Sequence, residues 1–152
     1  MEFPYCKVLD FPKHQKRARM LPWIRIGIFN PNIPSKVIYP MGLIDSGADI
    51  SIIDREFGEE LGYVITKGSP ETLIGMGGGK TDGYIHELGY LIENPDKPRD
   101  IIKYKDYVVF TKNNFPATMP QQTAIFGTIG FFRHLIVTFM YPSGIQVQTR
   151  TS

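Results

Sequence analysis

A short polar turn between two apolar segments carries the residues best suited to chemistry in this chain. Asp45, Ser46 and Gly47 follow the apolar run that ends at Ile44, and a second apolar run covers Ile50–Ile53. Apolar flanks anchor such a turn in a core, so its carboxylate stands on a rigid base and can take or give a proton. Gly47 permits a close backbone approach, and Ser46 can donate a hydrogen bond. The alternative is an ordinary turn, because Asp-Ser-Gly often does no more than reverse the chain.

The composition limits the kind of protein that presents this turn. The chain has 152 residues, 42% of them hydrophobic and 21% charged, which is typical of a globular domain. The net charge of +2 gives no reason to expect a nucleic-acid partner. A single cysteine, Cys6, excludes an internal disulfide and a multi-cysteine zinc site. No apolar run is long enough for a membrane helix or a signal peptide, so we expect a cytoplasmic protein with no membrane partner.

The other chemistry-bearing residues do not predict a cofactor or a metal. The histidines are scattered without the spacing of metal ligands: His14, His86 and His134. Gly79-Lys80-Thr81 matches the end of a phosphate-binding loop, but that motif needs a glycine where Ile74 stands and a helix afterwards. The residues that follow alternate as in a strand. We therefore expect neither a nucleotide cofactor nor a bound metal.

Short strands are expected to position the polar turn. Ile24, Ile26 and Ile28 alternate with their neighbours in the period of a half-buried strand. Glycine and proline punctuate the chain between segments rich in Ile, Val, Tyr and Phe, which favours strands and tight turns. Further strands are predicted over Lys36–Ile44, Ile50–Ile53, Glu71–Ile74, Tyr84–Ile92, Lys103–Thr111, Thr123–Phe126, Leu135–Met140 and Ile145–Thr149, the last two as a closing hairpin.

Helices are expected to be few and short. Asp54 can cap a helix that has Glu56 near its start, and Gly62 can end it. Phe131–His134 can form one or two helical turns. The sequence therefore predicts an all-β domain with one or two short helices.

The first twenty residues differ from the rest of the chain. They show little apolar periodicity and gather the basic side chains Lys13, His14, Lys16, Arg17 and Arg19. We expect a solvated basic extension over residues 1–20 and one folded domain over residues 21–152. A pro-segment removed by self-cleavage and a weak contact with a polyanion remain as alternatives.

Three segments together resemble a known family. Asp45-Ser46-Gly47-Ala48 between apolar strands resembles the active-site signature of the retropepsin-like aspartic proteases. Leu73–Gly79 is similar to the glycine-rich flap hairpin that closes over the substrate in that family. Ala124–Gly127, followed by Phe131–Leu135, is similar to the segment and short helix that support the catalytic loop. The resemblance spans roughly Leu21 to Thr149, and it implies an acid protease fold, a closed β-barrel-like domain with a flap hairpin.

The resemblance also implies roles for individual residues. Asp45 would be the catalytic carboxylate, with Ser46, Gly47 and Ala48 supporting its loop. The substrate would contact Asp49, Gly75, Met76, Gly77, Gly78 and Gly79. Ile125, Phe126 and Gly127 would support the catalytic loop from behind. Arg133 is expected to form an ion pair, with an acid of a partner subunit as its candidate partner.

The sequence departs from the family in two places. Glu93–Gln122 is longer than the corresponding region of the compact viral enzymes. Lys80, Thr81 and Asp82 stand just beyond the flap glycines, where those enzymes tend to be apolar. These differences bear on the preferred substrate and on the flap more than on the reaction.

The number of catalytic loops predicts a homodimer. Single-chain relatives of this fold need two Asp-Ser/Thr-Gly loops, and this sequence has one. A two-fold dimer would bring both Asp45 side chains to its axis, where the pair shares a proton and activates a water against a peptide carbonyl. The expected function is peptide-bond hydrolysis at acid to mildly acid pH. The alternative is a catalytically inactive dimeric module of the same fold, used for binding or assembly.

Overall fold

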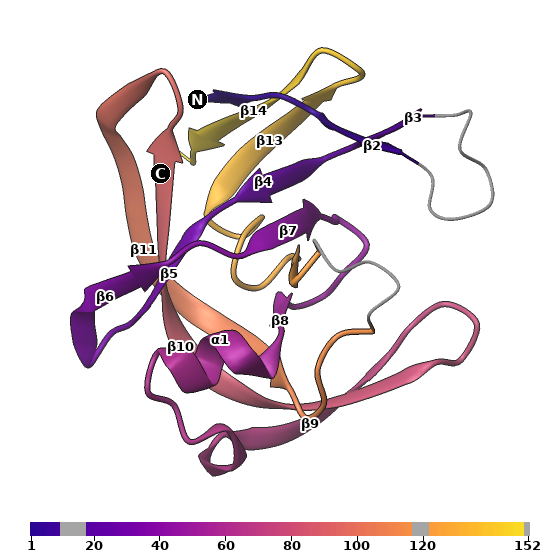
Figure 1. The fold of residues 1–152 in the computed structure, drawn as a ribbon, viewed down its shortest axis with the longest axis vertical. Helices are drawn as coiled ribbons and strands as arrows, with labels where there is room; N and C mark the ends of the chain where they lie inside the picture. Colours follow the sequence, from indigo (N-terminus) through magenta and orange to yellow (C-terminus); the bar gives the residue numbers. More distant parts are fainter. Residues whose placement is uncertain (10–17, 117–121, 151–152) are drawn as a thin grey trace.

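The computed structural model describes residues 1–9, 18–116 and 122–150, and they form a mostly-β domain (Figure 1). Strands make up 61% of the structure, and the described residues contain one short α-helix. The prediction of a β domain with few and short helices is therefore confirmed.

Most strands belong to one large sheet. Its main path runs through β4 (Trp23–Arg25), β7 (Met41–Ile44), β12 (Ala124–Phe126), β8 (Ile52–Ile53), β11 (Lys97–Thr111), β10 (Lys80–Asn94), β5 (Gly27–Asn30) and β6 (Ile33–Ile38). β9 (Ser69–Ile74) pairs with β10 beside this path. Among the described residues β4 pairs only with β7 and β6 only with β5, so both strands are edges. The predicted closed barrel is accordingly not found in this part of the chain.

A smaller sheet is built from the two ends of the described chain. β1 (Glu2–Phe3) pairs with β14 (Gly144–Thr149), which pairs in turn with β13 (Leu135–Met140), as the predicted closing hairpin requires. β2 (Cys6–Leu9) and β3 (Ala18–Leu21) form a separate two-stranded ribbon.

The described part of residues 1–20 is not the solvated extension that we expected. Phe3 is buried, and the terminal ammonium of Met1 donates to the Val147 carbonyl oxygen at 2.9 Å. β3 also continues across the expected domain boundary at residue 21. The correction follows from strand pairing, because β14 supplies backbone partners that local sequence does not reveal. Four of the basic side chains, Lys13, His14, Lys16 and Arg17, lie outside the described residues.

Two predicted strands are each divided in the structure. The segment around Ile26 changes partners there, because β4 pairs with β7 whereas β5 pairs with β10. The predicted strand Lys36–Ile44 breaks at Tyr39-Pro40, since proline has no N–H to donate to a ladder. In contrast, β11 begins six residues earlier than the predicted Lys103 and pairs with β10 along a long hairpin.

The helical predictions have different outcomes. α1 (Arg55–Glu60) begins after Asp54, whose carboxylate accepts a hydrogen bond from the Glu56 N–H at 3.1 Å. Gly62 follows the helix with a φ of 85°, a conformation that favours glycine. Phe131–His134 forms a hydrogen-bonded turn rather than a helix. A single-turn 3-10 helix covers Ile65–Lys67.

One hydrophobic core joins the large and the small sheet. Its largest fully buried side chains are Tyr90, Phe110, Phe126, Phe131, Ile26, Ile28, Ile53, Leu88, Ile92, Leu135, Ile145 and Val108. Ile44 and Ile53 belong to this core and flank the polar turn on both sides. The turn is therefore anchored at both ends by buried apolar side chains, which is what its sequence predicted.

Candidate active site

Asp45 follows directly on β7 and lies at the edge of the core. Its backbone N–H donates to the Phe126 carbonyl oxygen at 3.1 Å, which extends the contact between β7 and β12. Its Oδ1 accepts a hydrogen bond from the Gly47 N–H at 2.9 Å, so the carboxylate closes its own turn. Asp45 is half-buried, while Ser46 and Gly47 are exposed. One carboxylate oxygen is therefore fixed although the residue remains accessible to solvent.

Backbone hydrogen bonds from the segment after β12 hold the remainder of the loop. The Thr128 N–H donates to the Ala48 carbonyl oxygen at 2.8 Å, and the Ile129 N–H donates to the Asp49 carbonyl oxygen at 2.9 Å. The N–H and the Oγ of buried Ser51 both donate to the Ile129 carbonyl oxygen, at 2.8 and 2.9 Å. The loop is thus held along its length by a neighbouring segment, unlike a turn that depends on its own residues alone.

Gly127 permits this close approach. Its N–H donates to the Ser51 Oγ at 3.0 Å, and a Cβ at this position would lie 2.6 Å from the Ala48 carbonyl oxygen. Real Cβ atoms do not approach a backbone oxygen so closely, so the packing requires glycine here. Ile125 and Phe126 precede it in β12, which lies between β7 and β8. Of the three residues expected to support the loop, Phe126 and Gly127 contact it, and Ile125 pairs with Leu43 and Ile52 in the flanking strands.

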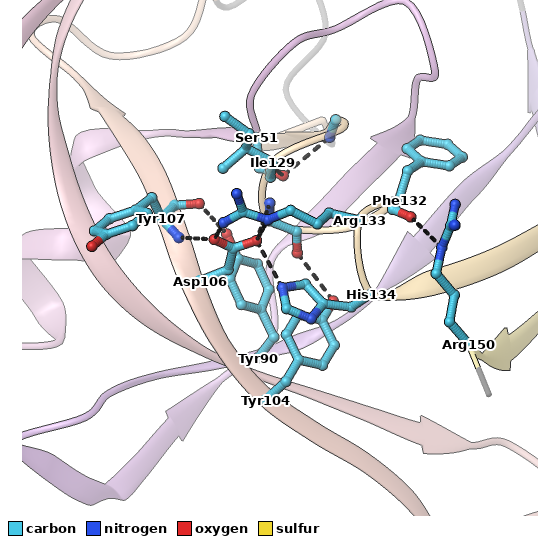
Figure 2. A network of polar contacts seen from close by, with 12 residues as sticks. Ser51, Tyr90, Tyr104, Asp106, Tyr107, Ile129, Phe132, Arg133, His134 and Arg150 are labelled. Carbon is cyan, nitrogen blue, oxygen red and sulfur yellow. Dashed lines mark hydrogen bonds and ion pairs between the residues drawn. The ribbon is translucent and has the colours of Figure 1, made fainter. Parts of the chain in front are cut away.

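A buried carboxylate that we did not predict holds the same segment from its other side (Figure 2). The Asp106 side chain is 2% exposed and accepts the N–H groups of Gly130 at 2.9 Å and Tyr107 at 2.8 Å. Arg133 donates to it through Nε at 3.0 Å and through Nη2, and the His134 Nε2 donates at 2.8 Å. Arg133 therefore pairs with an acid of its own chain, which corrects the expected pairing with a partner subunit.

Hydrogen bonding sets the charge state of this carboxylate. Burial by itself would raise the pKa of Asp106, but the hydrogen bonds from Arg133, Gly130, Tyr107 and His134 outweigh it and hold the pKa below its ordinary value. Asp106 is therefore ionised throughout the mildly acid range in which paired carboxylates work.

Two tyrosines complete the surroundings of Asp106. The Tyr104 hydroxyl donates to the Gly130 carbonyl oxygen at 3.0 Å, and its ring stacks on His134 with centroids 4.3 Å apart. The Tyr90 hydroxyl donates to the Tyr107 carbonyl oxygen at 3.1 Å, and burial raises the pKa of Tyr90. The sequence did contain a signal for this cluster, because Asp106 interrupts the apolar series Ile102, Tyr104, Val108 and Phe110 on the inward-facing side of β11.

The predicted flap is a hairpin of β9 and β10 with a glycine-rich tip. Ile74 pairs with Lys80, and the Gly75 N–H donates to the Gly79 carbonyl oxygen at 2.8 Å. Gly77 and Gly78 have φ values of 86° and 81°, which other residues rarely adopt. Figure 1 shows this tip projecting away from the rest of the domain. The Met76 side chain is fully exposed, so nothing in the described chain occupies its apolar surface.

A cavity of about 430 Å³ lies between the flap hairpin and the strands around the Asp45 loop. Ile52 of β8 and Ile125 of β12 provide its apolar wall, and the departing strand of the flap provides Lys80, Thr81 and Asp82. The other lining residues are Thr111, Asn113, Asn114, Phe115, Pro116 and Gln122. Its volume is that of a ligand pocket, although Asp45 is not among its lining residues.

The remaining candidate residues have separate positions. Asp49 is exposed within the Asp45 loop, and Asp54 caps α1 and also accepts the Phe115 N–H at 2.7 Å. His86 donates to the Ile65 carbonyl oxygen at 2.8 Å, whereas His134 donates to Asp106. Within residues 1–9, 18–116 and 122–150, no three His, Cys, Asp or Glu side chains gather in a way that could hold a metal ion.

No protein-family model matches the chain, and no curated protein matches it. Over the described ranges, no helix has the length and apolar character needed to cross a membrane.

Proposed function

We propose that this chain is an aspartic endopeptidase with the retropepsin-like fold, active as a homodimer. The observation that carries the proposal is that backbone hydrogen bonds hold the Asp45 loop in place. A half-buried carboxylate stands on a loop that β12 and the following segment hold by at least three backbone hydrogen bonds, those of Asp45, Thr128 and Ile129. A plain turn needs no such support, whereas a catalytic group must be held in a fixed geometry.

The proposed mechanism needs two copies of the loop. Two Asp45 carboxylates at hydrogen-bonding distance cannot both ionise cheaply, so the pair shares one proton. The ionised member accepts a proton from a water molecule that attacks the peptide carbonyl, and the protonated member donates to the developing oxyanion. The apparent pKa values then belong to the pair rather than to either chain.

The flap hairpin and the cavity suit a peptide substrate. The glycine tip can open and close, while Met76 offers an apolar surface to whatever lies beneath the closed flap. Asp49, next to the catalytic loop, and Gly75–Gly79 are the proposed substrate contacts. The cavity between the flap base and Ile125 would receive one side chain of the peptide.

Cleavage of a peptide library from about pH 4 to about pH 7 tests the proposal. Asp45→Asn should lower the rate by about 100-fold to 10,000-fold, because asparagine cannot act as a general acid or base. Its amide oxygen can still accept the Gly47 N–H, so the loop should keep its shape. Asp96→Asn is the matched control, since Asp96 is an exposed acid in the turn between β10 and β11.

Sedimentation of the same proteins separates the alternatives. A folded dimer of the native chain that cuts no peptide would contradict the protease and favour the binding or assembly module. A monomer at every concentration, together with cleavage, would contradict the shared site. Loss of cleavage in both Asp45→Asn and Asp96→Asn would mean that the charge change, rather than the catalytic position, causes the defect.

A further inference from the structure

The cavity beside the flap is lined by a lysine that forms no ion pair with any described residue. Lys80 lines it at the start of β10, and its side chain forms none of the ion pairs among the described residues. The apolar side chains of Ile52 and Ile125 line the same cavity. A ligand group that fits both surfaces has a short apolar stem and a negative end.

The acid closest in sequence lines the same cavity but does not pair with this lysine. Asp82 lies two residues further along β10, but its Oδ1 accepts the Thr72 hydroxyl at 2.7 Å and it forms no ion pair with Lys80. Asp82 also lines a neighbouring cavity together with Lys112 and Glu71. One carboxylate oxygen of Asp82 therefore already has a hydrogen-bond partner. None of the three N–H donors of the Lys80 side chain has a partner among the described residues.

A second donor faces the same cavity. Gln122 lines it, and its Oε1 accepts the indole N–H of Trp23 at 3.0 Å. Because an indole nitrogen only donates, this contact fixes the amide orientation and leaves the Gln122 NH₂ as the group available to a ligand. Another lining residue, Asn114, donates to Glu56 at 2.5 Å. The unused polar groups of Lys80 and Gln122 are thus both donors.

We propose that this cavity receives an acidic side chain of the substrate and that Lys80 is the residue that selects it. The stem of a glutamate would lie along Ile52 and Ile125, and its carboxylate would accept from Lys80 and from the amide of Gln122. The inference rests on the proposed protease function where it concerns cleavage, but it also concerns binding, which can be measured without cleavage.

The test compares peptides that differ only by glutamate or glutamine at each position of a positional-scanning library. The native chain should prefer glutamate at one position by about twofold to fivefold, the usual contribution of a charge pair close to solvent. The preference should appear as the pH rises through about 4.3, where glutamate ionises, and should weaken from about 0.05 M to about 0.5 M salt. Lys80→Met should abolish it, and Lys80→Glu should favour lysine or arginine instead.

Lys97→Glu is the matched control, because it makes the same charge change as Lys80→Glu at a different place. Lys97 pairs with Asn94, which lies at the other end of β10 from Lys80. It should leave the glutamate preference as in the native chain. The role of Lys80 would be overturned if the native and Lys80→Glu proteins preferred glutamate equally. It would also be overturned if Lys97→Glu lost the glutamate preference as fully as Lys80→Glu.

Binding of the same peptides to the Asp45→Asn chain distinguishes this inference from the proposed function. Discrimination between glutamate and glutamine that depends on Lys80 supports the inference even if the native chain cuts nothing. Cleavage by the native chain with no such discrimination leaves the protease standing and overturns the inference. Absence of both cleavage and Lys80-dependent binding overturns both.

Discussion

Replacing Asp106 by asparagine should destabilise the segment that supports the Asp45 loop. The substitution keeps the size of the side chain but replaces one acceptor oxygen with an NH₂ group. Asp106 accepts from two backbone N–H groups, those of Gly130 and Tyr107, and asparagine can satisfy only one of them. The backbone N–H group that is not satisfied would face the NH₂ group of asparagine, in a site where water has little access.

The expected cost is about 2–4 kcal/mol of the free energy of unfolding. A buried donor left without a partner costs about 1–3 kcal/mol, and the lost charge-assisted hydrogen bonds add to this. The side chains of Arg133 and His134 are 48% and 31% exposed, so both can form hydrogen bonds with water in the variant. The loss of stability should therefore be smaller than for breaking an ion pair that is fully buried. For the same reason, Arg133→Gln should be less destabilising than Asp106→Asn.

The pH dependence provides a second and independent check. The pKa of Asp106 is lowered in the folded chain, so its contribution is complete above the unfolded value of about 4 and is lost as the pH falls through the lower folded value. The stability difference between native protein and Asp106→Asn should therefore be constant in the mildly acid range and shrink below about pH 4.

Urea unfolding of the native, Asp106→Asn and Arg133→Gln proteins measures both effects. The reasoning is refuted if Asp106→Asn unfolds within about 0.5 kcal/mol of the native chain, or if Arg133→Gln is the more destabilised variant. A difference that grows as the pH falls below about 4 would contradict the assigned charge state.

Two further predictions concern the glycines and the flap. Gly127→Ala should cost about 1–3 kcal/mol and impair cleavage, because its Cβ would lie 2.6 Å from the Ala48 carbonyl oxygen. Gly79→Ala is its control, since no atom lies within 4 Å of the added Cβ; equal thermal shifts in the two variants would refute the packing argument. Met76→Ala should leave stability within about 0.5 kcal/mol, because Met76 is fully exposed. It should raise the KM for peptides about threefold to tenfold by removing an apolar substrate contact, and an unchanged KM would show that the flap does not use this side chain.

Local sequence determined the class of fold and several of its elements. Alternating apolar residues and frequent glycine and proline predicted strands, and Asp54 and Gly62 predicted both ends of α1. The flap hairpin and the closing hairpin were also expected, because their strands are adjacent in the sequence and their turns carry characteristic residues. Each of these features depends on residues only a few positions apart, so a pattern in the sequence is sufficient.

Tertiary structure alone decided how the candidate site is supported. Asp106 lies 27 residues before Arg133, and only the packing of β11 against the turn after β12 brings them together. The same holds for Gly127 against the Asp45 loop and for β1 against β14. The partners in such contacts are chosen by strand order and register, which arise from burying many side chains at once rather than from any short segment. The sequence therefore indicated the candidate carboxylate, and the fold determined what holds it in place.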